Sequence, residues 1–208
     1  MPIINQVVKG SGGSVPPLCM QFRNVNGTIQ KPNTVMDFTG ATDVGYEALK
    51  NLCYENRTIT TPVTLSPLQS VSGNYGCFQM FNSCNYIPSI DVSSLVSITG
   101  DYAFGGAFAF CEAITSMSFD NLSVLSGANV FTEAFWYCSG LTTLSFPALK
   151  STSFGLQNSQ FENMLLDVDG CTVHFPSNLQ SVIGSWSDVT GGFGGTNTTV
   201  LFDLPATN

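Results

Sequence analysis

Charged residues are scarce in this sequence, and those present are mostly acidic. Only 10% of the 208 residues are charged, and six Lys and Arg stand against 14 Asp and Glu, so the formal net charge is −8. Such a chain lacks the cationic surface that neutralises phosphates, which argues against nucleic acid and anionic membranes as partners. Ser, Thr, Asn and Gly must therefore cover much of the outside, which favours a β-rich protein of extracellular type.

Long apolar runs are also missing. No run approaches the roughly 20 residues that a spanning helix needs, so we expect no membrane insertion. Residues 1–9 lack the cationic start and apolar stretch of a secretory signal. We therefore expect either that a signal is absent from this sequence or that the protein reaches the outside by another route.

The residues that commonly carry catalysis or metals are few. His174 is the only histidine, and the seven cysteines form no C-x-x-C pair, so neither a zinc site nor another cofactor is expected. A hydrolase would need His174 beside a nucleophile and an orienting acid such as Asp167 or Asp169. The repeat described below places His174 just beyond a strand, on a surface of small residues. We therefore expect a surface residue without a catalytic role, in a protein that is not an enzyme.

A 27-residue repeat is the strongest positive signal. Three F-x-x-C blocks have this spacing, at Phe81–Cys84, Phe108–Cys111 and Phe135–Cys138. An L-x-x-L-x-L pattern follows each block, beginning at Ile87, Ile114 and Leu141, and a glycine precedes each block, at Gly73, Gly100 and Gly127. Such self-similarity at a fixed period is typical of repeat proteins.

The same spacing extends without gaps in both directions. One column is apolar throughout: Phe38, Leu65, Val92, Phe119, Phe146, Val173 and Val200. The column two positions earlier is Met36, Val63, Ile90, Met117, Leu144, Cys171 and Thr198, and it fails only at the last position. The column between these two is small and polar: Asp37, Thr64, Asp91, Ser118, Ser145, Thr172 and Thr199.

An apolar–polar–apolar triplet has the period of a short strand with one buried face. A single strand in each repeat cannot bury its apolar face alone, whereas stacked coils would pair the strands in a parallel sheet around a shared core. The sequence therefore predicts a repeat solenoid with one short parallel strand per coil. We expect the stretch before each F-x-x-C block to return as a turn with one or two short helical turns. Four phenylalanines of these stretches would fill the core: Phe104, Phe108, Phe131 and Phe135.

The blocks resemble the BspA-like leucine-rich repeats in their A-F-x-x-C-x-x-L-x-x-x-x-F pattern, which runs from Ala107 to Phe119 and from Ala134 to Phe146. Phe146-Pro-Ala-Leu149 also matches the exit of that family's strand, and Phe175-Pro-Ser-Asn-Leu179 matches it with one extra residue. The resemblance covers about residues 54 to 185. It implies a right-handed solenoid of leucine-rich-repeat type with a binding or adhesive role and no catalysis. The period is longer than the family's, and in the first coil Tyr54 and Arg57 stand in the places of Phe and Cys.

The cysteines of the blocks, Cys84, Cys111 and Cys138, share one column and should point inward as inert thiols, since a buried cysteine behaves as a small apolar residue. Three others lie outside this column, at Cys19, Cys53 and Cys77. A single disulfide among these three is left open.

Two groups of residues are candidates for binding. The polar column, represented by Asp37, Thr64, Asp91, Ser118, Ser145 and Thr172, should line the exposed face of the sheet, either as a simple covering or as a hydroxyl-rich docking surface. A second group consists of the aromatic residues near the Cys column, Tyr86, Phe110, Trp136 and Tyr137, which are interpreted either as anchors for a ligand or as a second layer of the core.

The two ends of the chain depart from the repeat. Residues 1–26 are predicted to be an N-terminal cap or an anchoring segment, because the apolar stretch 3–8 precedes a Gly/Ser linker at 9–17. This arrangement is similar in style to the N-termini of phage tail and fibre appendages. Residues 27–204 are assigned to the solenoid, with a last strand at 198–202 that caps it, and residues 205–208 to a tail.

These features predict a non-enzymatic adhesion module that recognises a receptor, either a protein or a glycan of a host surface. We expect it on a phage virion or a bacterial surface, with other virion proteins contacted through residues 1–17. Assembly into a homo-oligomer is left open. The alternative is a structural component of a virion or surface layer without a receptor role.

Overall fold

The computed structural model describes residues 43–66, 68–150, 159–183 and 193–207. The predicted N-terminal segment 1–26, with its apolar stretch and linker, and the column positions Met36, Asp37 and Phe38 lie outside these residues.

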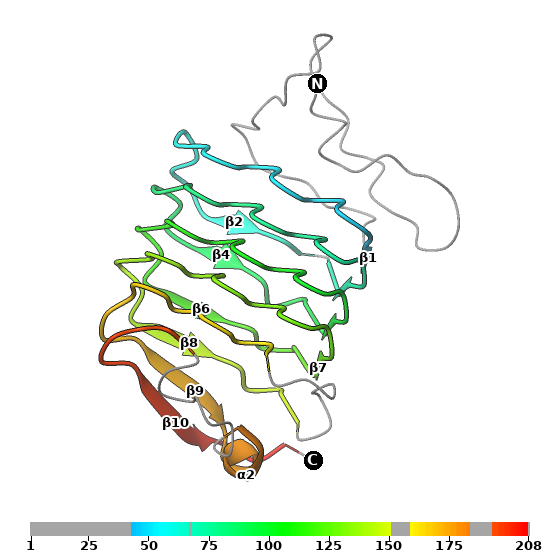
Figure 1. Ribbon diagram of the computed structural model, residues 1–208, viewed down its shortest axis with the longest axis vertical. Helices are drawn as coiled ribbons and strands as arrows, with labels where there is room; N and C mark the ends of the chain where they lie inside the picture. Colours follow the sequence, from blue (N-terminus) through cyan, green and yellow to red (C-terminus); the bar gives the residue numbers. More distant parts are fainter. Residues whose placement is uncertain (1–42, 67, 151–158, 184–192, 208) are drawn as a thin grey trace.

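The described chain winds into a β-solenoid of about five turns whose strands are all parallel. Figure 1 shows the coils stacked in the order of the sequence, from blue to red. Most paired strands are roughly 27 residues apart, as in Val63 with Ile90 and Ser116 with Thr143. The predicted repeat and the predicted parallel stacking are therefore confirmed.

The prediction of one strand per coil is wrong, because the strands form two rows. The first row is the sheet of β1 (Asp43–Val44), β3 (Ser70–Val71), β5 (Ser97–Ile98) and β7 (Val124–Leu125). The second row consists of two sheets, one of β2 (Val63–Thr64) and β4 (Ile90–Asp91), the other of β6 (Ser116–Ser118), β8 (Thr143–Ser145), β9 (Thr172–Pro176) and β10 (Thr199–Leu204). Each first-row strand is only two residues long, too short for a period of two to stand out in the sequence.

A third side of each coil is built from consecutive turns, which we call the turn ribbon (residues 45–56, 73–84, 100–111, 127–138 and 159–168). Within a coil, alternate amides donate to the carbonyl three positions earlier, as in Leu52 N to Leu49 O at 3.1 Å. The amides between them donate to the next coil, as in Cys53 N to Met80 O at 2.7 Å. The predicted helical turns are therefore wrong. The helical segments of the described residues are η1 (Ser177–Leu179) and α2 (Gln180–Ile183), which follow β9.

The turn ribbon has a period of four along the chain. Every fourth residue has a positive φ, as at Glu47 and Asn51, with φ values of 50° and 58°. Side chains then point inward in pairs and outward in pairs, so that Val130 and Phe131 are buried while the neighbouring Glu133 is partly exposed. The ribbon thus fills the core and presents an outer surface at the same time.

Stacked aromatic rings form the centre of the core. The predicted plugs Phe104, Phe108, Phe131 and Phe135 are all completely buried. Phe108 and Phe135 stack at 5.1 Å between ring centroids, and Phe119 and Phe146 stack at 5.0 Å. Aromatic pairs at such distances stabilise by about 0.5–1.5 kcal/mol each beyond the burial of their area.

Glycine marks the point where each coil leaves the first row of strands. A Cβ added at Gly100 would lie 2.1 Å from the carbonyl oxygen of Gly73, and a Cβ at Gly127 would lie 2.2 Å from that of Gly100. These distances leave no room for a side chain, because successive backbones touch at this corner. The glycine column of the sequence is therefore a requirement of the close approach between coils.

Three departures from the 27-residue frame correct the predicted alignment, and one of them places Phe161 at the position equivalent to Phe131, 30 residues on. In the turn ribbon, the hydrogen bond from Cys53 N to Met80 O matches that from Phe81 N to Ala107 O, so Cys53, and not Tyr54, takes the place of Phe81. Asn56, and not Arg57, likewise takes the place of Cys84. Another departure is in the strands, where the pairing of β9 with β8 lies two positions beyond the frame.

This shift of two positions moves three predicted column members. Leu144 pairs with Val173 and not with Cys171, and Phe146 stacks on Phe175 at 5.3 Å. Thr172 pairs with Thr143, so its predicted place beside Ser145 is wrong. The residue beside Ser145 is His174, which lies inside β9 and not beyond a strand.

Candidate functional site

The Cys column lies inside the bend that ends each turn ribbon. Three thiols donate to the carbonyl of the preceding coil: Cys84 to Cys53 at 3.0 Å, Cys111 to Phe81 at 3.2 Å and Cys138 to Phe108 at 3.0 Å. Burial raises the pKa of the Cys138 thiol to about 12. A thiol with so high a pKa is a poor nucleophile and a poor metal ligand, so this column is structural.

All six described cysteines are buried thiols outside any disulfide, as predicted for the Cys column. Cys53 and Cys77 are therefore not bridged, while Cys19 lies outside the described residues. The described residues contain no group of three or more His, Cys, Asp or Glu side chains that could hold a metal ion. No helix among them is both long enough and apolar enough to cross a membrane.

The predicted polar column is divided between the two sheets of the second row. On β2 and β4, the Thr64 hydroxyl donates to the Asp91 carboxylate at 3.2 Å. Hydrogen bonds from Ser93 and from Thr64 hold the pKa of Asp91 below its usual value. On β6 and β8, the Ser145 hydroxyl donates to the Ser118 hydroxyl at 2.7 Å. The exposed hydroxyls and carboxylates thus bind one another along the stack.

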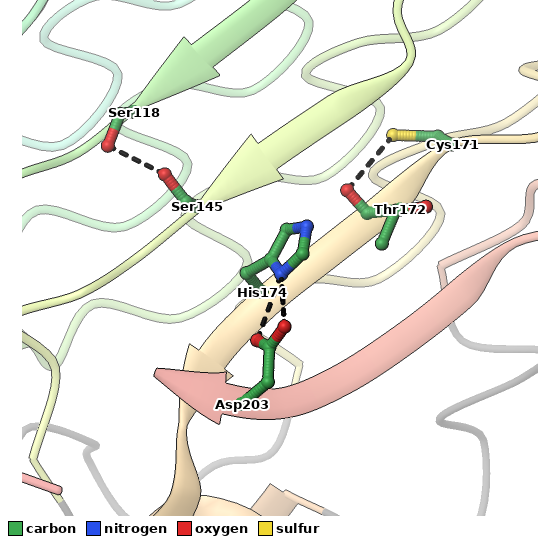
Figure 2. A network of polar contacts seen from close by, with 6 residues as sticks. All are labelled: Ser118, Ser145, Cys171, Thr172, His174 and Asp203. Carbon is green, nitrogen blue, oxygen red and sulfur yellow. Dashed lines mark hydrogen bonds and ion pairs between the residues drawn. The ribbon is translucent and has the colours of Figure 1, made fainter. Parts of the chain in front are cut away.

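His174 continues the second part of this column. Its Nδ1 lies 2.9 Å and 3.0 Å from the two carboxylate oxygens of Asp203 on β10. Figure 2 shows the ring beside Asp203, with its other nitrogen directed away from Ser145. Ser145 in turn donates to Ser118, so the figure joins no serine hydroxyl to the imidazole. A Ser–His–Asp mechanism needs that contact, and the arrangement instead ties the last strand to its neighbour.

Three of the four predicted aromatic residues come together on the outside of the turn ribbon. We call Phe110, Trp136 and Tyr137 the aromatic patch. The ring of Phe110 lies 4.8 Å from that of Trp136 and 5.4 Å from that of Tyr137, measured between centroids. Tyr137 is 49% exposed, and Phe110 and Trp136 are half-buried. Tyr86 is 57% exposed and lies after the bend, in the turn that follows Cys84.

The aromatic patch has an acidic neighbour that the sequence did not reveal as part of a site. The indole Nε1 of Trp136 donates to the carboxylate of Asp167 at 3.0 Å. The two side chains are 31 positions apart in the sequence, so the 27-residue frame does not place them at matching positions of adjacent coils. The contact can be predicted only if the 27-residue frame is interrupted by a gap between Phe146 and Phe161.

Comparison with known proteins gives no relative on which to base a function. No family model matches the chain, and comparison with curated proteins and with solved structures found no match. A function has to be inferred from the geometry of the described residues.

Proposed function

We propose that this protein is a non-enzymatic binding module of adhesive type, which recognises a surface through the outer side of its turn ribbon. The observation that carries the proposal is the aromatic patch. Its three rings lie outside the core, where exposed aromatic side chains anchor ligands or partners. Tyr86, the fourth predicted binding residue of aromatic type, is exposed outside the patch.

The contrast between the inward and the outward positions of the turn ribbon supports this proposal. The inward pairs of the turn ribbon are apolar from coil to coil except at the buried Gln160, the counterpart of Val130. The outward position two residues after the buried residue at Cys53, Phe81, Phe108, Phe135 or Leu165 varies freely, as Glu55, Ser83, Phe110, Tyr137 and Asp167. A solenoid of this kind can change its surface without changing its backbone, which is how repeat proteins acquire binding surfaces.

We also propose that the solenoid is a divergent array of leucine-rich-repeat type, related to the BspA-like proteins. The buried Phe and Cys of each block and the apolar strand positions after it support this assignment. This assignment must also explain the two strand rows and the turn ribbon of this chain.

The proposed place of action is the outside of a bacterial cell or the surface of a phage particle. The scarcity of charge and the hydrogen-bonded hydroxyls along the strands support an extracellular surface. Residues 1–17 would attach the solenoid to other virion proteins. The alternative is a structural component of a virion or surface layer.

Binding to intact surfaces tests the proposal. Purified full-length protein is mixed with Gram-negative and Gram-positive cell envelopes, and the bound fraction is measured for the natural chain, for Tyr137→Ala and for Tyr46→Ala, which removes a 65% exposed tyrosine outside the patch. We expect binding to at least one envelope, with a loss of tenfold or more in Tyr137→Ala and little change in Tyr46→Ala. No binding to any envelope, together with cross-links only between copies of the chain, would favour the structural alternative.

A further inference from the structure

We propose that the aromatic patch, with Asp167 at one end and Ser83 at the other, is a binding site for neutral glycans built of pyranose rings. This inference rests on the proposed function and names its ligand. The site is one row across successive coils, in which Ser83, Phe110, Tyr137 and Asp167 hold equivalent positions. Their equivalence follows from the hydrogen bonds of Ser83 N to Ala109 O, Phe110 N to Trp136 O and Tyr137 N to Leu166 O.

The fold does not require aromatic side chains in this row. Phe110 and Tyr137 have φ values of 59° and 55°, in the left-handed region that bulky residues rarely occupy. That conformation belongs to the ribbon and recurs at every fourth residue. Other coils place Glu55, Ser83 and Asp167 at the same position. Since the same backbone accepts polar residues here, two adjacent aromatic residues outside the core point to a role in binding.

The rings of the patch are held in place before any ligand arrives. The hydrogen bond from Trp136 to Asp167 fixes the indole, and Phe110 packs against it at an interplanar angle of 59°. Phe110 also lies at 33° to the ring of Tyr137, whose side chain remains half exposed. Fixed rings lose little conformational entropy on binding, which favours affinity for a small ligand.

The chemistry of the row matches a pyranose. The face of an aromatic ring carries partial negative charge, and it attracts the C–H bonds on the face of a sugar ring. The hydroxyl groups at the rim of the sugar can donate to the Asp167 carboxylate at one end of the row. At the other end they can donate to the Ser83 hydroxyl, which itself donates to Asn82 Oδ1 at 2.8 Å. With a strand spacing of about 4.8 Å, the row spans roughly 14 Å from Ser83 to Asp167. That length suits an oligosaccharide better than a single sugar.

The charge around the site selects a neutral ligand. Among described residues 100–150 and 159–168, the only cation is Lys150, against six carboxylates: Asp101, Glu112, Asp120, Glu133, Glu162 and Asp167. An acidic glycan would meet repulsion there and no compensating cation. The small size of the patch favours a glycan over a protein, because a stable protein interface takes about 20–30 residues on each side.

Titration with defined oligosaccharides tests this site. Full-length protein is titrated with chitotriose, cellotriose and maltotriose, and with sialyllactose as an acidic comparison, by calorimetry and by saturation-transfer NMR. We expect at least one neutral trisaccharide to bind, with saturation transferred to the C–H protons of its ring face, and sialyllactose to bind at least tenfold more weakly. Tyr137→Ala and Asp167→Asn should each weaken binding by tenfold or more.

The control is Tyr46→Ala, which removes a 65% exposed tyrosine of the first described coil, outside the row, and should leave the affinity unchanged. Equal losses in Tyr46→Ala and Tyr137→Ala would overturn the site. Competition on the envelopes separates this inference from the proposed function, with the tightest-binding neutral trisaccharide added in excess. Envelope binding that depends on Tyr137 but is not displaced by that trisaccharide would overturn the glycan and leave the binding module standing.

Discussion

The thiol of Cys111 donates a hydrogen bond to the backbone carbonyl of Phe81, one coil earlier, at 3.2 Å. Both groups are buried, and the same bond recurs from Cys138 to Phe108 at 3.0 Å. The Phe81 carbonyl also accepts from the Cys84 amide at 3.0 Å, and the Phe108 carbonyl accepts from the Cys111 amide at 3.0 Å, so the thiol is the second donor to each of them. The cysteine of these blocks therefore adds a hydrogen bond between adjacent coils at the bend.

Replacement of Cys111 by valine tests this role. Cys111→Val keeps an apolar side chain of similar size but removes the thiol donor. We expect the free energy of unfolding to fall by about 0.5–1.5 kcal/mol, because the Phe81 carbonyl keeps the Cys84 amide as a donor. Urea denaturation measures it. Cys171→Val is the matched control, because the sulfur of Cys171 makes only a long contact of 3.8 Å to Thr172 O. An equal loss in both variants would show that the hydrogen bond contributes nothing.

The buried thiols also predict how stability depends on pH. Burial raises the pKa of Cys138 and of Cys171 to about 12, above the value of 9.0 expected for the unfolded chain. Between pH 9 and 12 the unfolded state therefore binds fewer protons than the folded state. Stability contributed by these thiols is present below pH 9 and is lost as the pH rises.

Urea unfolding at pH 8, 9, 10 and 11 measures this loss. The double variant Cys138→Ala/Cys171→Ala should show a shallower decline above pH 9, by up to about 1.4 kcal/mol per pH unit for each thiol removed. Parallel curves for the variant and the natural chain would contradict the raised pKa values.

Gly100 and Gly170 have different surroundings, so we expect their replacement by alanine to destabilise the fold by different amounts. Gly100→Ala places a Cβ 2.1 Å from the Gly73 carbonyl, so the two coils must separate. Gly170→Ala meets nothing within 4 Å and suffers only from its φ of +73°, at roughly 1–2 kcal/mol. We expect Gly100→Ala to be the more destabilising by several-fold in thermal and urea unfolding. Similar midpoints for both variants would show that the coils can separate at little cost.

Much of this architecture can be predicted from the sequence because the coils repeat. The F-x-x-C blocks and the apolar triplets reveal the period, the parallel pairing and the buried rings of Phe108 and Phe135. The return path cannot be predicted in the same way. Its period of four in buried pairs, as in Ala134 and Phe135, is close to the helical period of 3.6, so the sequence pattern does not distinguish the ribbon from short helical turns.

The error at β9 has a different cause. Side chains alternate along a strand with a period of two, so a shift of two positions keeps every apolar position on the inner face. An ungapped 27-residue frame therefore aligns Cys171 with Leu144 and Val173 with Phe146, and both positions are apolar. In the structure, Val173 pairs with Leu144 and Phe175 stacks on Phe146. The position of His174 beside Ser145 and the contact of Trp136 with Asp167 were hidden by the same break in the repeat.

The candidate site depends on contacts that have no signature in a single coil. The sequence suggests Phe110, Trp136 and Tyr137 as aromatic residues near the Cys column, but it leaves open whether they form a second layer of the core. Their place outside the core follows from the turn ribbon, in which Trp136 and Tyr137 point outward after the buried Phe135.

The register between β8 and β9 gives the most direct test of the stacked coils. Cysteines introduced as Ser145→Cys/His174→Cys would occupy adjacent strands, about 4.8 Å apart, within the Cα range of a disulfide. Ser145→Cys/Thr172→Cys would place them two positions out of register, at roughly 8 Å. We predict that mild oxidation of the folded protein, followed by mass spectrometry of peptides, finds the bridge from 145 to 174 and not the bridge from 145 to 172. A bridge from 145 to 172, or none from 145 to 174, would contradict the stacking on which both proposals rest.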